Sequence, residues 1–154
     1  MSAQRISRFL STWPLAVPVL LFAVGILVWS ARARETGEEV TPLLSTGMTV
    51  LGQPFSYPTQ APAKVTAAIV AMQPGAETGW HEHDVPLLAY MLEGELTVDY
   101  GTKGTRVYRK GDSLVEAIDV AHNGRNTGSG VARILAVFIG ADGVPDTVPV
   151  KNPQ

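Results

Sequence analysis

The stretch Pro74–Gly94, PGAETGWHEHDVPLLAYMLEG, decides the fold, because it places His81 and His83 two residues apart in a segment that reads as extended chain. Side chains two residues apart in a β-strand point to the same face, so this segment presents both imidazoles to one side. The chain has three histidines, and the third, His122, follows in the segment 111–126. That segment offers a third nitrogen for the same point. We therefore expect a site where all three histidines converge.

The chain from Leu43 onward lacks a helical repeat and consists of short apolar runs separated by Gly, Pro and Asp–Gly. The strongest runs are Lys64–Met72, Leu87–Leu92 and Val131–Ile139. About nine or ten short antiparallel strands joined by frequent turns indicate an all-β sandwich or small barrel. Residues 140–154 include three prolines, and we expect them to trail over the surface.

The composition limits the kinds of site that the chain can build. Its 154 residues suffice for one domain with a hydrophobic core. Cysteine is absent, so a metal must be held by histidine, carboxylate or water. Three of the 12 basic residues lie in the first 33 positions, which contain no acid, so the remainder is acidic. An acidic body argues against nucleic acid as a partner, because phosphate binding needs clustered Lys and Arg.

The N-terminal residues 1–34 form a leader or an anchor. Arg5 and Arg8 precede an apolar run, Trp13–Trp29, of about the length that crosses a bilayer. The segment Ala31–Arg32–Ala33 has the form of a signal-peptidase site. An uncleaved transmembrane anchor, a cleaved signal peptide and a buried helix all fit this sequence. The first two place the body in the cell envelope, on the periplasmic or extracytoplasmic side, or secrete it. Residues 35–47 are expected to be a polar linker.

Glycine and asparagine positions complete a spaced pattern around the histidines. In chain order the pattern consists of Gly75, His81, His83, Gly94, Gly111, His122 and Asn126. It resembles the two motifs of the cupin superfamily, G-x5-H-x-H-x3-E-x6-G and G-x5-P-x-G-x2-H-x3-N. The resemblance implies an all-β double-stranded β-helix, a jelly-roll barrel, here over residues 48–144 after one N-terminal hydrophobic helix. Residues 145–154 would be a C-terminal tail.

Cupins typically bind a divalent metal through three His and one Glu, so the resemblance implies that His81, His83 and His122 are metal ligands. Leu87 occupies the position of the motif's glutamate, so the fourth protein ligand is missing. Three-His sites without the carboxylate occur among cupins. Iron, manganese, nickel, copper and zinc are all compatible with imidazole ligands. Ala117 and Asp119 replace the motif's Pro and Gly, a change that affects turn geometry more than chemistry.

Glu116 is the candidate catalytic residue, because it sits in an apolar segment, VEAI, where an unpaired buried carboxylate is costly. It either faces solvent or enters the barrel as an acid/base or as a partner of the metal ligands. The strand parity of Asp84 points that carboxylate outward. Asn126 is expected to bond a neighbouring turn rather than to do chemistry.

Two classes of function fit these observations. In the first, the chain is a small-molecule metalloenzyme, an oxidoreductase such as a dioxygenase, or an isomerase or hydrolase that uses the metal as a Lewis acid. In the second, it is a non-catalytic, membrane-tethered module that binds or senses a ligand or metal. Leu87 also allows a structural barrel that has lost its metal. The resemblance further implies a homodimer through an edge strand or exchanged N-terminal strand, for which Val50–Pro62 is the candidate.

Overall fold

The computed structural model describes residues 39–59 and 61–153. Its elements in chain order are β1 (Ala63–Met72), β2 (His81–Glu82), β3 (Leu87–Glu93), β4 (Glu95–Asp99), the 3₁₀ turn η1 (Gly101–Lys103), β5 (Thr105–Arg109), β6 (Ser113–Val115), β7 (Asn123–Arg125), β8 (Ala132–Ala141) and β9 (Val148–Pro149). The prediction of an all-β jelly-roll is confirmed. The predicted N-terminal helix lies outside the described residues.

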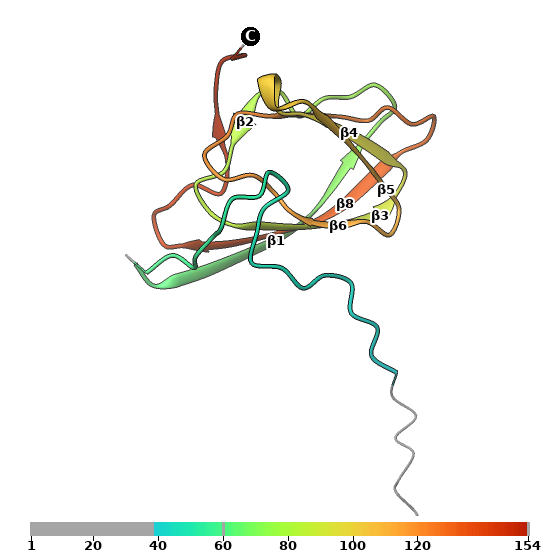
Figure 1. The fold of residues 1–154 in the computed structure, drawn as a ribbon. Helices are drawn as coiled ribbons and strands as arrows, with labels where there is room; N and C mark the ends of the chain where they lie inside the picture. Colours follow the sequence, from blue (N-terminus) through green and yellow to red (C-terminus); the bar gives the residue numbers. More distant parts are fainter. Residues whose placement is uncertain (1–38, 60, 154) are drawn as a thin grey trace, which may run out of the picture. The chain divides into compact units, whose positions relative to one another are not determined.

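Three antiparallel sheets form the walls of the barrel. The largest has the strand order β1-β8-β3-β6, the second β5-β4-β7, and the third is the pair β2-β9. Strands β1 and β8 pair over ten residues, from Ala63 opposite Ala141 to Met72 opposite Ala132. Figure 1 shows the large sheet on one side of an interior that β4 and β2 border on the other. The sheets therefore enclose a space between them rather than packing flat on each other.

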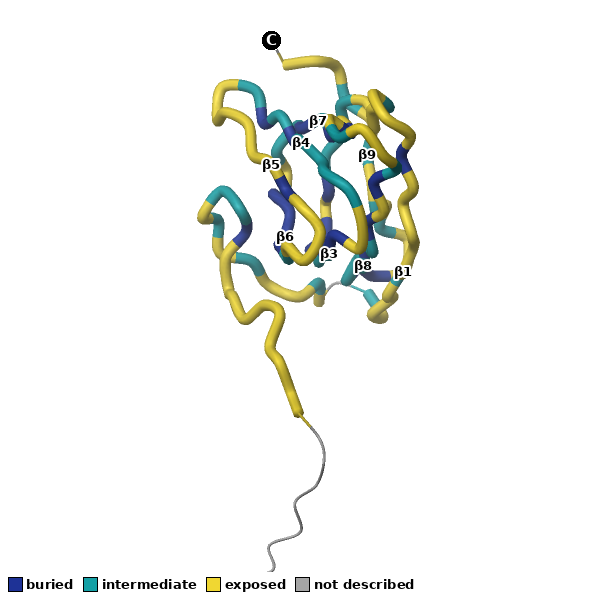
Figure 2. Tube along the Cα trace, turned by 90° about the vertical axis from the view of Figure 1, so that its right-hand side faces the viewer, coloured by how far each residue is buried: buried dark blue, intermediate teal, exposed yellow. Residues whose placement is uncertain are grey.

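The inward face of each long strand is set by alternation. In β8, Ala132, Ile134 and Ala136 are buried, and they alternate with more accessible neighbours. In β3, Leu87, Ala89 and Met91 are buried in the same way. This period of two is the signature of a strand with one face toward a core. Figure 2 shows these buried positions along the strands and the exposed segment that leads into them.

A bulge interrupts the pairing of β3 with β8 just before Gly94. The register between β3 and β8 shifts between Met91 and Glu93, and Gly94 has a φ of 78°. A Cβ on Gly94 would lie 2.6 Å from the carbonyl oxygen of Val131. Only glycine permits both this backbone conformation and this approach of two chains.

Several segments differ from the sequence-based expectation. The edge pieces expected within Val50–Pro62 are not strands, and only a single bridge joins Met48 to Pro54. The trailing segment carries strand β9, which pairs with β2. No helix within residues 39–59 and 61–153 is long and apolar enough to span a bilayer. The apolar run Trp13–Trp29 lies outside those ranges.

Candidate metal centre

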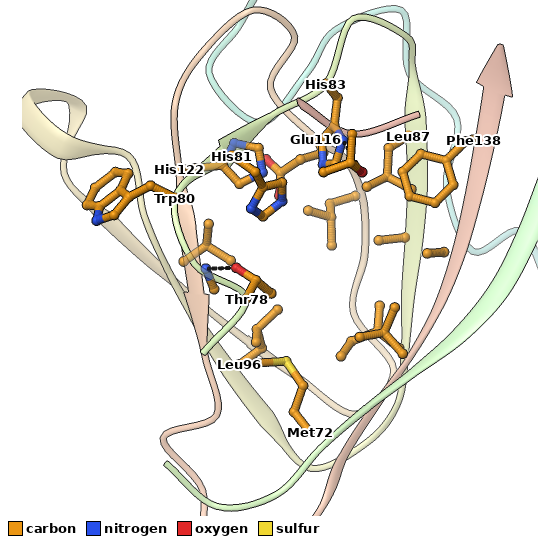
Figure 3. Close-up of a pocket in the computed structure, with 18 of the residues that line it drawn as sticks. Met72, Thr78, Trp80, His81, His83, Leu87, Leu96, Glu116, His122 and Phe138 are labelled. Atoms are coloured by element: carbon orange, nitrogen blue, oxygen red, sulfur yellow. Dashed lines mark hydrogen bonds between the residues drawn. The ribbon is translucent and has the colours of Figure 1, made fainter. Parts of the chain in front are cut away.

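The structure brings the three histidines to one point. His81 lies in β2, His83 follows that strand, and His122 immediately precedes β7. His81 and His122 are directly opposite each other, because each backbone N–H donates to the other residue's carbonyl, at 3.0 and 2.8 Å. The candidate ligand atoms of all three rings lie within 4.8 Å of one another. Figure 3 shows the three imidazoles projecting into one pocket.

Each imidazole is oriented by a backbone carbonyl. Nδ1 of His81 lies 2.9 Å from the carbonyl oxygen of Gly79, Nδ1 of His83 lies 2.8 Å from that of Asp146, and Nδ1 of His122 lies 2.8 Å from that of Val120. A carbonyl only accepts, so Nδ1 must be the protonated nitrogen in each ring. Nε2 is then left with a free lone pair. This is the arrangement that holds metal-binding histidines in one tautomer and one orientation.

Burial of the three imidazole rings keeps them neutral. Desolvation is the main cause that lowers the pKa of His81, His83 and His122, and the pKa of His83 falls to about 4. The hydrogen bonds to the carbonyls act in the opposite direction and do not reverse the shift. A metal binds neutral imidazole, so protons compete little for this site near neutral pH. Three neutral and preoriented nitrogen donors, of which those of His83 and His122 are buried and that of His81 is half-buried, fit a divalent transition metal.

The centre opens into a cavity of about 310 Å³ whose wall is mostly apolar. Its lining comes from both sheets and from β2 and β9, and includes Met72, Leu87, Met91, Leu96 and Phe138. Leu87 is buried beside the histidines, so the position of the motif's glutamate contributes only hydrocarbon. Trp80 also borders the cavity, but Figure 3 shows its ring turned away from the imidazoles.

Glu116 lies inside this cavity, and the alternative that it faces solvent is wrong. It is 6 % exposed, and its Oε1 accepts hydrogen bonds from the Tyr100 hydroxyl and the Ala117 backbone N–H, both at 2.7 Å. Within the described part of the chain, no hydrogen bond to Oε2 is recorded. Burial raises the pKa of Glu116, against the lowering effect of the two hydrogen bonds. The carboxyl group is therefore held in place through one of its oxygens.

A tyrosine pair beside Glu116 was not anticipated from the sequence. The hydroxyl groups of Tyr100 and Tyr108 lie 3.3 Å apart, and the ring of Tyr100 also packs 5.7 Å from that of His122. Burial raises the pKa of Tyr100 well above its usual range and that of Tyr108 to about 12. Both hydroxyls stay protonated at neutral pH. Tyr100 lies two residues after the buried Val98, and this spacing in an extended segment was the sequence signal that places the Tyr100 side chain inside.

The C-terminal segment also completes the site. Thr147 and Pro149 line the cavity, and the carbonyl of Asp146 holds the ring of His83. The expectation of a segment that only trails over the surface was therefore incomplete. Because β9 is two residues long and flanked by irregular chain, no alternation marks it in the sequence.

Two other candidates behave as expected from their parity and residue type. Asp84 is exposed and does not join the three-histidine group. Asn126 is buried and bonds backbone rather than the cavity: its Nδ2 donates to the carbonyls of Met72 and Gly130, and its Oδ1 accepts from Gly128. Asp119, at the position of the motif's glycine, adopts a φ of 53°. This is a left-handed backbone conformation, which glycine adopts more readily than aspartate.

Comparison with known proteins places these features in a family. Residues 68–138 match the family model of the Cupin domain. No curated protein matches the chain. Among solved structures, the DMSP lyase DddQ from Ruegeria pomeroyi DSS-3 is 21% identical with a TM-score of 0.50, over 67% of this chain and 49% of that one.

Oxalate decarboxylases are a second group of similar structures. The Lactobacillus farciminis enzyme in its formate complex is 25% identical with a TM-score of 0.49, over 56% of this chain and 26% of that one. The Bacillus subtilis enzyme at pH 4.6 is 24% identical with a TM-score of 0.47, over 56% and 23%. This chain thus spans about a quarter of the decarboxylases and about half of the lyase.

The matched segment 68–138 runs from β1 through most of β8 and contains all three histidines. The fold of the lyase agrees with that match. Residues 68–138, which make up most of this barrel, therefore match the Cupin domain family, and the barrel has the cupin jelly-roll fold.

Proposed function

We propose that this chain is a small-molecule metalloenzyme in which His81, His83 and His122 bind one divalent transition metal. The observation that carries the proposal is the set of three neutral imidazoles, each with Nδ1 fixed by a carbonyl and Nε2 left free. A group of histidines that served only packing would not need three matched tautomers at one point. Iron, manganese, nickel, copper and zinc all suit these ligands.

The absence of a carboxylate at position 87 shapes the chemistry that the site supports. Three protein ligands leave coordination positions for water or substrate, as in catalytic rather than structural metal sites. An ion held by these residues would supply Lewis acidity or, if it is redox-active, electron-transfer chemistry. An oxidoreductase of the dioxygenase kind is our first candidate reaction, and isomerisation is the second.

Glu116 is the residue that we assign to proton transfer. Its Oε1 is fixed by Tyr100 and by a backbone N–H, and the residue lines the cavity. Burial raises the pKa of this carboxyl group toward neutral pH, and a general acid or base works best when its pKa is near the working pH. The chain thus holds a substrate group between three imidazoles and one carboxyl group.

A second candidate function is a non-catalytic module that binds or senses a ligand or metal. The observation that favours it is the apolar wall, in which Glu116 is the one carboxyl group among the described lining residues. Replacement of Glu116 by Gln separates the two functions. If the chain is an enzyme, Glu116→Gln should lower turnover by about 10²–10⁴-fold while the metal content stays the same.

Location and assembly are further parts of the proposal. The apolar run at residues 13–29 supports a membrane anchor or signal peptide, with the barrel on the extracytoplasmic side. Strand β1 is an edge strand with exposed Val65 and Ile69, which supports a homodimer that covers it. Fractionation of cells and sedimentation of the purified chain test these two points.

Metal analysis of the purified full chain tests the central proposal. We expect about one transition-metal ion per chain by inductively coupled plasma mass spectrometry, and its loss in a His81→Ala/His122→Ala double variant. Asn123→Ala is the matched control, because Asn123 adjoins His122 but is not among the residues that line the cavity, and its side chain bonds Glu77 and, at 3.4 Å, the Thr78 hydroxyl. A parent chain that stays metal-free after incubation with each candidate ion would overturn the metalloenzyme proposal.

A further inference from the structure

We propose that the cavity binds a molecule with one oxygen-bearing head group and an apolar body, of roughly ten non-hydrogen atoms in all, because each water-sized atom occupies about 30 Å³. The cavity volume of about 310 Å³ sets that limit. Only the head group rests on the proposed function, since the metal centre would hold it. The body is argued from the cavity wall alone.

The wall divides into a small polar end and a large apolar end. The titratable side chains of the lining are the three histidines and Glu116. Figure 3 shows Met72 and Leu96 across the pocket from His83 and Glu116. Atoms bound near Met72 and Leu96 lose their water, and the polar side chain nearest to Leu96 in the lining, Thr78, already bonds the backbone of Gly79 and Gly124. Such a surface favours hydrocarbon, because burying a polar group without a partner is costly.

No lysine or arginine is among the described residues that line the cavity. A second carboxylate on the ligand would therefore lie in the apolar end without a cation to pair with it. In the proposed function the metal ion is the only positive charge available to the ligand, and it pairs with one head group. This excludes dicarboxylates as good ligands and favours monofunctional molecules.

Small side chains on neighbouring strands make the room for the apolar body. Ala89 of β3 lies opposite Ala136 of β8, and both are buried and line the cavity. A larger side chain at either position would project into the same space. Ala136 is therefore the residue at which the length of the accepted ligand can be changed.

A homologous series of straight-chain monocarboxylates, from acetate to decanoate, tests the proposal on the full chain. The readout is the ¹³C-methyl NMR signal of labelled methionines, with and without Zn²⁺. Met72 and Met91 line the cavity, whereas Met48 is 51% exposed and lies outside it. We expect shifts at Met72 and Met91 without a shift at Met48.

The affinity should follow the length of the chain. Each added methylene should tighten binding by about fourfold, as expected for burial of one CH₂ group. The gain should end near octanoate, which has ten non-hydrogen atoms. Adipate has the same carbon count as hexanoate but a second carboxylate, and it should bind at least tenfold more weakly.

Two variants test the assigned position in the cavity. In Ala136→Leu the affinity should stop rising about three carbons earlier in the series, because the larger side chain fills that much of the cavity. Ala67→Leu is the matched control on β1, since Ala67 pairs with Val137 and faces away from the cavity. If Ala136→Leu does not fold, the smaller Ala136→Val provides the same comparison with a shorter displacement.

The outcomes for the ligand class and for the metal centre can be told apart. Affinity that does not depend on chain length, or adipate that binds as tightly as hexanoate, overturns the ligand class even if zinc is bound. A chain that binds none of the candidate ions overturns the proposed function, and the series on metal-free protein still tests whether the cavity binds an apolar body. Equal effects of Ala136→Leu and Ala67→Leu would place binding outside the cavity and refute the proposal.

Discussion

Asn126 is a buried side chain that ties three backbone segments together, and its replacement by alanine should strongly destabilise the barrel. The residue is 1% exposed. Its Nδ2 donates to the Met72 carbonyl, which ends β1, and to the Gly130 carbonyl, both at 2.8 Å, while Oδ1 accepts from the Gly128 N–H at 2.9 Å. Asn126→Ala removes all three hydrogen bonds and leaves their backbone partners in place.

The expected loss follows from the burial of those partners. A buried polar group left without a hydrogen bond costs about 1–3 kcal/mol. The Met72 carbonyl is buried, whereas the two loop groups are partly accessible and can regain water. We therefore expect a loss of about 3 kcal/mol in the free energy of unfolding, a large part of the 5–15 kcal/mol of a typical domain.

Urea denaturation of the metal-free protein measures this loss, with Asn123→Ala as the matched control. Asn123 lies three residues earlier. Its side chain donates to Glu77 at 3.1 Å and accepts from the Thr78 hydroxyl at 3.4 Å, and both bonds are exposed, so its replacement should cost under about 1 kcal/mol. A loss for Asn126→Ala no larger than that of the control would refute the reasoning. Reduced metal content in a fully folded Asn126→Ala protein would assign the residue to the centre instead.

Three further changes probe the pH response and the backbone. Burial lowers the pKa of His83 to about 4 from 6.5, so His83 takes up its proton at a higher pH in the unfolded chain than in the folded one. The free energy of unfolding of the metal-free protein should therefore fall by about 3 kcal/mol between pH 6.5 and 4. In urea melts, His83→Gln should weaken this dependence of stability on pH, and an unchanged dependence would contradict the assignment. Gly94→Ala should cost at least about 2 kcal/mol more than Gly52→Ala, because the two glycines have nearly the same φ, 78° and 77°, but only Gly94 meets the Val131 carbonyl, at 2.6 Å; equal thermal shifts would contradict this. Asp119→Gly should stabilise by up to about 1 kcal/mol by relieving a φ of 53°, and a clear loss in the urea midpoint would show that the Asp119 side chain has a role of its own.

Elements with a strong local pattern could be predicted from the sequence. Strands β1, β3 and β8 follow continuous apolar runs whose bounds agree with the structure within a few residues. The convergence of the histidines was also accessible, because a period of two places His81 and His83 on one face. These properties depend on neighbours in the chain, which the sequence displays directly.

The orientation of Glu116 could not be decided in the same way. In the preceding strand β6, Leu114 and Val115 are both buried although they point to opposite faces. The outer face is covered because the N–H of Val50 donates to the Val115 carbonyl, which brings the segment before β1 over it. With both faces covered, the alternation that reveals an inward side chain is lost.

The contribution of residues 146–149 was beyond sequence reasoning for another reason. A two-residue strand carries no measurable period, and its role follows from pairing with β2, more than sixty positions earlier. The contact of the Asp146 carbonyl with His83 is likewise a property of the folded chain alone.

That contact sets an order of events during synthesis. The three histidines leave the ribosome well before residues 146–149, and until β9 pairs with β2 the ring of His83 has no carbonyl to fix its tautomer. A nascent chain therefore displays two oriented imidazoles and one free to rotate. The full affinity for a metal ion is reached only when the segment that follows β8 has docked. A chain truncated near residue 145 should therefore fold most of its barrel and still bind metal weakly.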